Sequence, residues 1–167
     1  MTRIIDCTDT TTKERKRSVK GVPFFIRDDT VDVMTDHADS GLLDDSEIMG
    51  LMIGRVYRDG EGEYVMVDRT VSSVLDADEV SVRFDKNDMS QLIDSVDEMK
   101  DGERVVGWYH SHLGCGCFLS DTDLDTHSGI FGDGIGFAVV IDPVLRQLKV
   151  FGRTNEGLMP VQMMVME

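Results

Sequence analysis

The chain has 167 residues, and its 41% hydrophobic content is enough to fill the core of one domain without a disulfide framework or a structural metal. Seventeen basic residues against 32 acidic ones give a net charge of −15. Such a surface repels phosphate backbones and anionic lipids, so the composition excludes nucleic acid and membrane as first partners. No apolar run reaches membrane-spanning length, and the first twenty residues lack the apolar region of a signal peptide. With an odd number of cysteines, three, the composition predicts a protein of a reducing, cytoplasmic compartment.

The first 20 residues differ from the remainder of the chain. They mix threonine with a basic cluster from Lys13 to Lys20 and show no apolar period. We therefore expect residues 1–20 to form a flexible basic arm and residues 21–167 to form the folded domain.

The first half of the domain is expected to hold a strand, a helix and a long hairpin. Residues 22–26 form a short apolar run typical of a strand. A helix should follow to about Ser40, capped by Asp28 or Asp29, with Gly41 as its stop. The hairpin should join residues 47–57 to residues 64–74, and its glycines indicate bulges or close backbone approaches.

The second half is expected to alternate helices and strands. A Met-rich tail at residues 159–167 suits either an edge strand or a partner surface. Because no internal repeat is present, the pattern predicts a single α/β domain. The expected elements are helices at residues 85–99 and 120–131, and strands at residues 104–109, 136–142 and 148–153.

The densest chemistry lies between His110 and Asp123. His110 and His112 are two residues apart at the end of a predicted strand, so both imidazoles share one face. Asp123, early in the following helix, offers an oxygen ligand. Each residue alone would suit a structural role, as a core histidine or a helix N-terminal charge. Together, two histidines and one aspartate with an open fourth position describe a catalytic zinc site.

Two cysteines leave an alternative ligand set open. Cys115 or Cys117 could complete the site as a thiolate, since the spacing H-x-H-x2-C-x-C also suits zinc. Against this, Asp123 would then be spare, and Gly114 and Gly116 make the loop a poor clamp for an ion.

The motif His110-Ser111-His112, seven residues, Ser120, two residues and Asp123 resembles the H-x-H-x7-S-x2-D signature of the JAMM (MPN+) metallopeptidases. The flanking strings G-W-Y-H-S-H and G-C-F-L-S resemble the proteasome-lid deubiquitinase branch of that family, as do E-I-M-G-L-M-I-G upstream and A-V-V-I-D-P downstream. The resemblance implies one MPN-type domain of cytidine-deaminase-like α/β architecture, in which helices flank a curved mixed β-sheet. A stand-alone prokaryotic or archaeal member is the closest match in size.

The resemblance also implies a role for each site residue. His110, His112 and Asp123 would bind one Zn²⁺ per chain, with water as the fourth ligand. Glu47 would be the general base, and Ser120 would donate a hydrogen bond to the oxyanion. Cys117 matches a cysteine that does not bind the metal. Ser111 points to the opposite face and is expected to fix the strand.

The implied activity is a zinc-dependent isopeptidase that cuts between the C-terminus of a ubiquitin-like, β-grasp modifier and a lysine or short peptide. A sulfur-carrier processing peptidase with the same site and a non-catalytic MPN scaffold remain the alternatives. Modifier proteins and their conjugates are the expected partners, and a homodimer is left open. Two departures from the family pattern are Leu113 in place of a proline and a short acidic stretch at residues 74–82 in place of an insertion that grips the modifier's tail.

Overall fold

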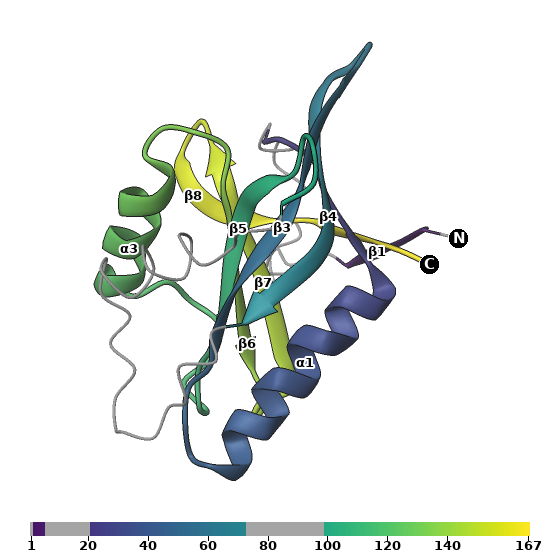
Figure 1. The fold of residues 1–167 in the computed structure, drawn as a ribbon. Helices are drawn as coiled ribbons and strands as arrows, with labels where there is room; N and C mark the ends of the chain where they lie inside the picture. Colours follow the sequence, from purple (N-terminus) through teal and green to yellow (C-terminus); the bar gives the residue numbers. More distant parts are fainter. Residues whose placement is uncertain (1, 6–20, 73–98) are drawn as a thin grey trace.

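The computed structural model describes residues 2–5, 21–72 and 99–167, which build one mixed sheet with helices on both faces (Figure 1). The strand order is β1-β9-β2-β4-β3-β5-β6-β7-β8. The pairs β2–β4, β2–β9 and β5–β6 are parallel, and the others are antiparallel. The expected α/β architecture is confirmed, whereas the expected helix at residues 85–99 and the acidic stretch at residues 74–82 lie mostly or wholly outside the described residues. The elements are β1 (Thr2–Ile5), β2 (Phe24–Arg27), α1 (Asp28–Leu43), β3 (Met49–Asp59), β4 (Gly62–Ser72), β5 (Arg104–Ser111), α3 (Asp121–Phe131), β6 (Phe137–Asp142), β7 (Gln147–Thr154), β8 (Gly157–Val161) and β9 (Met163–Met166).

The sheet separates two apolar clusters. On the α1 face, Met34 and Ala38 of the helix pack with sheet residues such as Phe24, Val139 and Val165, all fully buried. On the α3 face, a smaller cluster forms around Leu51, Trp108 and Val140, with Ile130 and Phe131 of α3 packed against it. The larger cluster supplies most of the core, and the smaller one supports the end of β5.

Helix α1 begins and ends at residues other than those that the sequence predicts. Arg27 occupies the N-cap position without a side-chain cap, while Asp28 and Asp29 lie in the first turn. There the carboxylates still face the positive end of the helix dipole, which explains their placement. The helix also continues past Gly41 to Leu43.

Gly41 has a packing role in place of the predicted terminating one. A Cβ there would lie 2.5 Å from Ile48 Cγ2 and 2.7 Å from the Ser46 carbonyl oxygen. The missing side chain therefore lets the segment that follows α1 fold back tightly against the helix. The Gly41 carbonyl accepts hydrogen bonds from the amides of Asp44 and Ser46, which closes this turn.

The predicted β3–β4 hairpin is confirmed, together with the role of its glycines. The β3–β4 register shifts between Ile53 and Gly54. A Cβ on Gly54 would collide with the Met66 carbonyl oxygen, so only glycine permits this approach.

Both ends of the described chain join the sheet. Residues 2–5 of the predicted arm pair as β1 with β9, while residues 6–20 lie outside the described residues. The prediction of a loose arm is wrong for residues 2–5, because the outer edge of β9 offers them unpaired backbone groups. For the Met-rich tail, the prediction of an edge strand is confirmed for β8. It is wrong for β9, which lies between β1 and β2 within the sheet.

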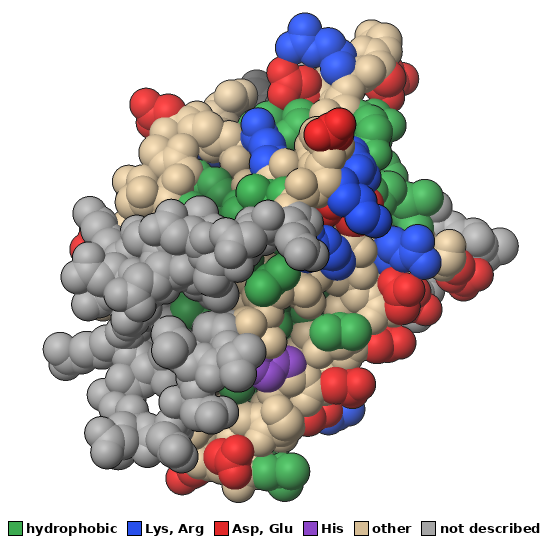
Figure 2. Space-filling model, viewed as in Figure 1, with side chains coloured by type: hydrophobic (Ala, Val, Ile, Leu, Met, Phe, Trp, Pro, Cys, Tyr) green, Lys and Arg blue, Asp and Glu red, His purple; other side chains and the backbone are tan. Residues whose placement is uncertain are grey.

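Charged side chains lie mainly on the outside, where several form ion pairs. Figure 2 shows Lys and Arg side chains gathered over the upper half of one face, with acidic side chains close by. On the hairpin, Arg55 pairs with Asp68 at 2.9 Å and Arg58 with Glu63 at 2.7 Å. Neither helix in the described part of the chain is long and apolar enough to cross a membrane.

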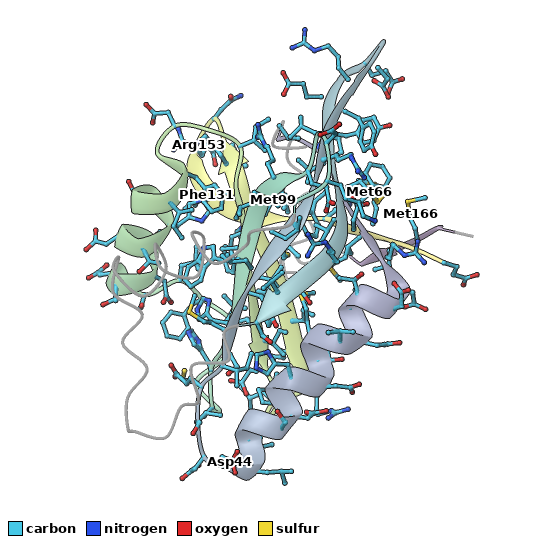
Figure 3. All side chains as sticks on the ribbon, in the orientation of Figure 1. Asp44, Met66, Met99, Phe131, Arg153 and Met166 are labelled. Carbon is cyan, nitrogen blue, oxygen red and sulfur yellow. The ribbon has the colours of Figure 1, made fainter. Side chains whose placement is uncertain are left out.

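The C-terminal end of α3 is anchored to β7. Arg153 of β7 donates to the carbonyl oxygen of Gly132 at 2.7 Å and pairs with Asp133 at 3.1 Å. Figure 3 shows Arg153 and Phe131 on the same side of the sheet, where the helix ends. This contact helps to hold α3 above the end of β5.

Candidate metal centre

Strand β5 carries the two histidines of the sequence motif to its carboxyl end. Trp108 and His110 face α3, whereas Tyr109 and Ser111 face α1, as alternation along a strand requires. His110 is 2% exposed and His112 is 5% exposed, so both imidazoles are withdrawn from water.

The first turn of α3 supplies the aspartate. Ser120 is the N-cap, and its Oγ accepts from the Asp123 amide at 3.1 Å, while Asp123 Oδ2 accepts from the Ser120 amide at 2.9 Å. This capping box fixes the carboxylate at the helix N-terminus and turns it toward β5.

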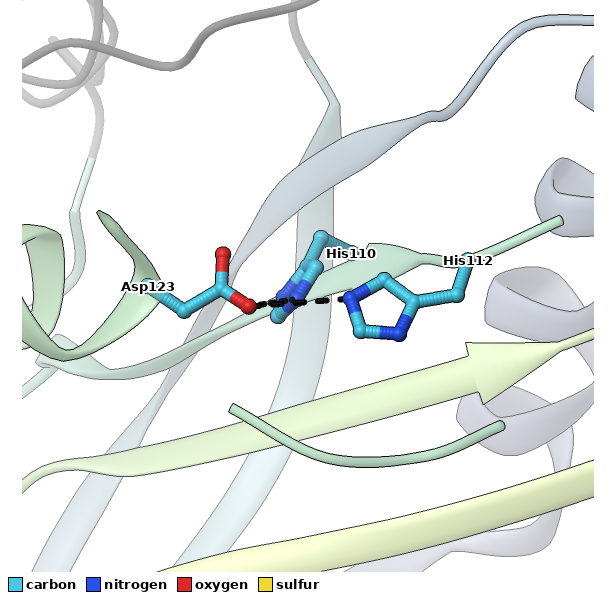
Figure 4. A group of neighbouring side chains, drawn as sticks. All are labelled: His110, His112 and Asp123. Atoms are coloured by element: carbon cyan, nitrogen blue, oxygen red, sulfur yellow. Dashed lines mark hydrogen bonds and ion pairs between the residues drawn. The ribbon is translucent and has the colours of Figure 1, made fainter. Parts of the chain in front are cut away.

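The three side chains converge on one point (Figure 4). Asp123 Oδ2 lies 3.1 Å from His110 Nε2 and 3.6 Å from His112 Nε2. The ligand atoms of all three lie within 4.8 Å of one another. Two imidazole nitrogens and one carboxylate oxygen at this spacing fit a Zn²⁺ ion by donor type and number, with a coordination position to spare.

The Nδ1 atoms of the two histidines have different surroundings, which bear on the orientation of each ring. His112 Nδ1 lies 2.7 Å from the Gly116 carbonyl oxygen. A carbonyl can only accept, so Nδ1 carries the proton and Nε2 is left to face Asp123. Among the described residues, His110 Nδ1 is the buried side-chain polar atom without a hydrogen-bond partner.

The charges of the site perturb its titrating groups in opposite directions. The hydrogen bond to Asp123 raises the pKa of His112, and the charge of Glu47 adds to that shift. Burial alone would raise the pKa of Asp123, but hydrogen bonds from His110 and His112 hold it well below its usual range. The carboxylate therefore stays ionised, as a metal ligand must be.

Glu47 lies two residues before β3. The register pairs Met49 with His110, and the charge of Glu47 acts on His112, so this carboxylate belongs to the surroundings of the site. Ser111 fixes this segment, because its Oγ accepts from the Ile48 amide at 2.8 Å and its own amide donates to the Ile48 carbonyl at 3.0 Å. The expectation that Ser111 secures the strand from the opposite face is confirmed.

Trp108 packs against His110, and His127 in turn holds Trp108. The Trp108 indole stacks on the His110 ring, with centroids 4.5 Å apart and planes 12° apart. Its Nε1 donates to His127 Nδ1 at 3.1 Å. Burial lowers the pKa of His127 to about 4, so the acceptor nitrogen stays unprotonated near neutrality.

The cysteines lie apart from the group of three ligands. Cys117 Sγ donates to the Val140 carbonyl at 3.3 Å, and burial raises the pKa of this thiol to about 11. Cys115 is exposed. Among the described residues, the group that could hold a metal contains His110, His112 and Asp123 and neither cysteine.

Sequence reasoning missed two supporting residues. His127 of α3 is only 3% exposed and accepts a hydrogen bond from Trp108, which no motif in the sequence indicates. Asp142 ends β6 and is fully buried, and the string A-V-V-I-D-P contains it without indicating a role. On the other face of the sheet, His37 is half-buried and its Nδ1 lies 2.8 Å from the Tyr109 hydroxyl.

Comparison with known proteins places this site in a family. The family model described as JAB1/Mov34/MPN/PAD-1 ubiquitin protease matches residues 20–130. The chain therefore belongs to the JAB1/Mov34/MPN/PAD-1 family, as the signature resemblance indicates.

Individual relatives agree with this assignment. The chain is 33% identical over 126 residues to COP9 signalosome complex subunit 5 of Candida albicans. The aligned part covers 70% of this chain and 20% of the relative. It is 36% identical over 101 residues to 26S proteasome regulatory subunit rpn11 of Schizosaccharomyces pombe, covering 59% and 32%. The chain thus spans about a fifth to a third of the length of these relatives.

A solved structure shares the fold. The solution structure of a Desulfitobacterium hafniense protein matches with a TM-score of 0.61 and 23% identity, over 86% of this chain and 93% of the other. At that identity the match supports the fold alone.

Proposed function

We propose that this protein is a zinc-dependent isopeptidase that hydrolyses the bond between the C-terminus of a ubiquitin-like modifier and a lysine side chain or short peptide. The observation that carries the proposal is the convergence of His110, His112 and Asp123, with the charge of Glu47 acting on His112. Membership of a family described by ubiquitin protease activity supports the same reaction class.

His110 Nε2, His112 Nε2 and Asp123 Oδ2 are the atoms that would hold the ion. When bound, Zn²⁺ supplies Lewis acidity, which would polarise the scissile carbonyl and lower the pKa of a bound water toward neutrality. The cysteine alternative receives no support from the geometry, since the Cys117 thiol is turned to Val140.

Glu47 is the proposed general base. Its charge acts on His112, so we infer that its carboxylate is close enough to the site to take a proton from the attacking water and pass it to the leaving amine. The Ser111 bonds to Ile48 hold this carboxylate near the histidines.

Ser120 is proposed to stabilise the oxyanion. Its Oγ already accepts from the Asp123 amide, so its own proton is free to point away from the helix. A hydrogen bond from this hydroxyl would be strongest when negative charge develops on the carbonyl oxygen. The capping box holds the hydroxyl in place beforehand.

The substrate class follows from the need to present one carbonyl to a buried site. A modifier with a slender extended C-terminal tail can reach it, whereas a folded segment cannot. Phe118 is 46% exposed and its ring centroid lies 4.8 Å from that of His112, so it offers an exposed apolar contact beside the site.

The test begins with the metal and a matched pair of aspartates. Asp123→Ala removes a ligand, while Asp121→Ala removes an exposed acid from the same helical turn. Metal analysis should give about one zinc per wild-type and Asp121→Ala chain and almost none for Asp123→Ala. Cleavage is then measured on a β-grasp modifier joined to lysine and on the same modifier with a linear C-terminal extension.

The outcomes separate the alternatives. Cleavage of the lysine conjugate by wild type and Asp121→Ala, but not by Asp123→Ala, supports the isopeptidase. Cleavage of the linear extension alone would favour a processing peptidase. Zinc retained in Asp123→Ala would contradict the ligand set, and a wild type without zinc would favour a non-catalytic scaffold.

A further inference from the structure

Asp142 is a buried carboxylate that the proposed reaction does not use. It ends β6, is 0% exposed, and forms no ion pair in the part of the chain that the structure describes. Its partners are four backbone amides. Burial alone would raise the pKa of Asp142, but these amides hold it below its usual value, so the group is ionised.

The four amides belong to two separate segments. Those of Val144 and Leu145 donate to Oδ1 at 3.1 and 3.0 Å, which closes the turn from β6 to β7. Those of Gly114 and Gly116 donate from the loop after His112, and the Gly116 amide is 2.7 Å from Oδ2. The turn alone would not need a buried charge, since a neutral side chain could close it.

The glycine loop needs an external anchor. Gly114 and Gly116 have φ angles of +99° and +93°, in the left-handed region where glycine is unstrained. Glycine loses the most conformational freedom on ordering, so such a loop is costly to hold in one shape. A carboxylate bonded to both glycine amides supplies that restraint.

The restrained loop contacts a proposed metal ligand directly. The Gly116 carbonyl accepts the proton on His112 Nδ1 at 2.7 Å. The end of β6 holds the same residue by its backbone, since the His112 amide donates to the Ile141 carbonyl at 2.9 Å. One strand end thus fixes both the main chain and the ring of His112.

We propose that Asp142 is a positioning residue that, through the Gly114–Gly116 loop, keeps His112 in the tautomer and orientation needed to bind a metal ion through Nε2. The proposal rests on the metal site of the proposed function. A neutral imidazole carries one proton, so a proton kept on Nδ1 leaves the Nε2 lone pair for the ion. If the loop loosens, the ring can carry its proton on Nε2, where it blocks coordination.

The experiment compares wild type with Asp142→Asn, Gly116→Ala and Asp68→Asn. Asp142→Asn turns one acceptor into a donor that faces backbone amides. Gly116→Ala strains the loop backbone at a positive φ angle while leaving the Asp142 side chain unchanged. Its Cβ would meet nothing within 4 Å, so the effect is not a collision. Asp68→Asn is the control, because it removes one acidic charge that pairs with Arg55 on the hairpin.

Two measurements are made on each protein. Zinc affinity is measured by competition with a chromophoric chelator. The proton position on each imidazole is read from ¹⁵N shifts of the metal-free protein at a pH where the histidines are neutral, with His37 and His127 as internal references. A purely structural role of Asp142 would not move the His112 signals alone.

We expect Asp142→Asn to weaken zinc binding about 10- to 100-fold and to shift His112 toward a mixture of tautomers, with His37 and His127 unchanged. Gly116→Ala should change both readouts in the same direction, and Asp68→Asn neither. A folded Asp142→Asn variant with wild-type zinc affinity and an unchanged His112 would overturn the proposal. If Asp142→Asn does not fold, Gly116→Ala decides, and wild-type behaviour there overturns it.

These readouts are independent of cleavage. Asp142-dependent zinc binding in a protein that cleaves no conjugate would leave the inference standing and remove the isopeptidase. Cleavage by wild type with no dependence of zinc affinity on Asp142 would do the reverse. A wild type that binds no zinc would remove both.

Discussion

The two faces of the sheet use the same kinds of polar side chains in opposite ways. On the α1 face, Tyr109 meets His37 and Ser111 meets Ile48, so each buried polar group has a partner within the fold. On the α3 face, the ligand atoms of His110, His112 and Asp123 lie within 4.8 Å of one another, and His110 Nδ1 has no hydrogen-bond partner among the described residues. The first face pairs its polar side chains within the fold, whereas the second gathers three side chains that could hold a metal ion.

This contrast shows how one strand can serve stability and chemistry together. Alternation along β5 sends Tyr109 to one side and His110 to the other. Burial raises the pKa of Tyr109 to about 12, so its hydroxyl stays neutral on the α1 face. The division predicts that changes on the two faces will have separable effects.

The largest expected effect is on turnover from Glu47→Gln. The amide cannot accept the proton of the attacking water, so kcat should fall about 10²- to 10⁴-fold. Zinc content and thermal stability should not change, because the proposed ligands are intact. Steady-state kinetics on a modifier–lysine conjugate measure this, with Glu61→Gln at the exposed hairpin turn as the control. Full activity in Glu47→Gln would show that another group is the base.

The next effect belongs to the α1 face. Met34 is fully buried between the helix and the sheet, so Met34→Ala should lower the free energy of unfolding by about 2–5 kcal/mol. Its neighbour Val33 is 55% exposed, and Val33→Ala should change stability by no more than about 0.5 kcal/mol. Urea unfolding measures both. Zinc affinity below the unfolding transition should match wild type in each, and a large loss in Met34→Ala would contradict the separation of the faces.

A smaller effect concerns His127, which is part of the packed core and also supports the proposed metal ligand His110 through Trp108. Because its pKa is about 4 in the fold against 6.5 in the unfolded chain, the unfolded state binds more protons between these values. The stabilisation is full above pH 6.5 and is lost as pH falls toward 4, by roughly 3 kcal/mol at most.

The pH effect is measured on metal-free protein against His127→Gln. Glutamine can still accept from Trp108 but does not titrate in this range. Shared contributions from other groups cancel in the difference between the two unfolding curves. Parallel curves from pH 7 to 4 would show that the Trp108–His127 bond does not depend on His127 being neutral.

Local spacing is enough to predict the proposed metal ligands, whereas the residues that support them depend on long-range packing. His110 and His112 share a face by strand alternation, and Asp123 lies one turn into the next helix. Asp142 matters because β6 pairs in parallel with β5, a contact that its own string of residues does not encode. His127 is buried only because α3 docks over Trp108.

The same reasoning explains the fold errors. The apolar pattern of β9 is equally suited to an edge or an interior strand, and its pairing with both β1 and β2 decides between them. Gly41 carries the usual signal of a helix end, yet the close approach of Ile48 is what requires a glycine there.

That close approach has a consequence beyond packing. Ser46 and Ile48, the two residues that press against Gly41, flank Glu47 in sequence. A residue with no side chain, on the structural face of the molecule, thereby sets how near an acid comes to the histidines on the other face. Any side chain at position 41 would push the Ser46–Ile48 segment outward and would carry Glu47, the proposed base, with it, although no functional group is removed.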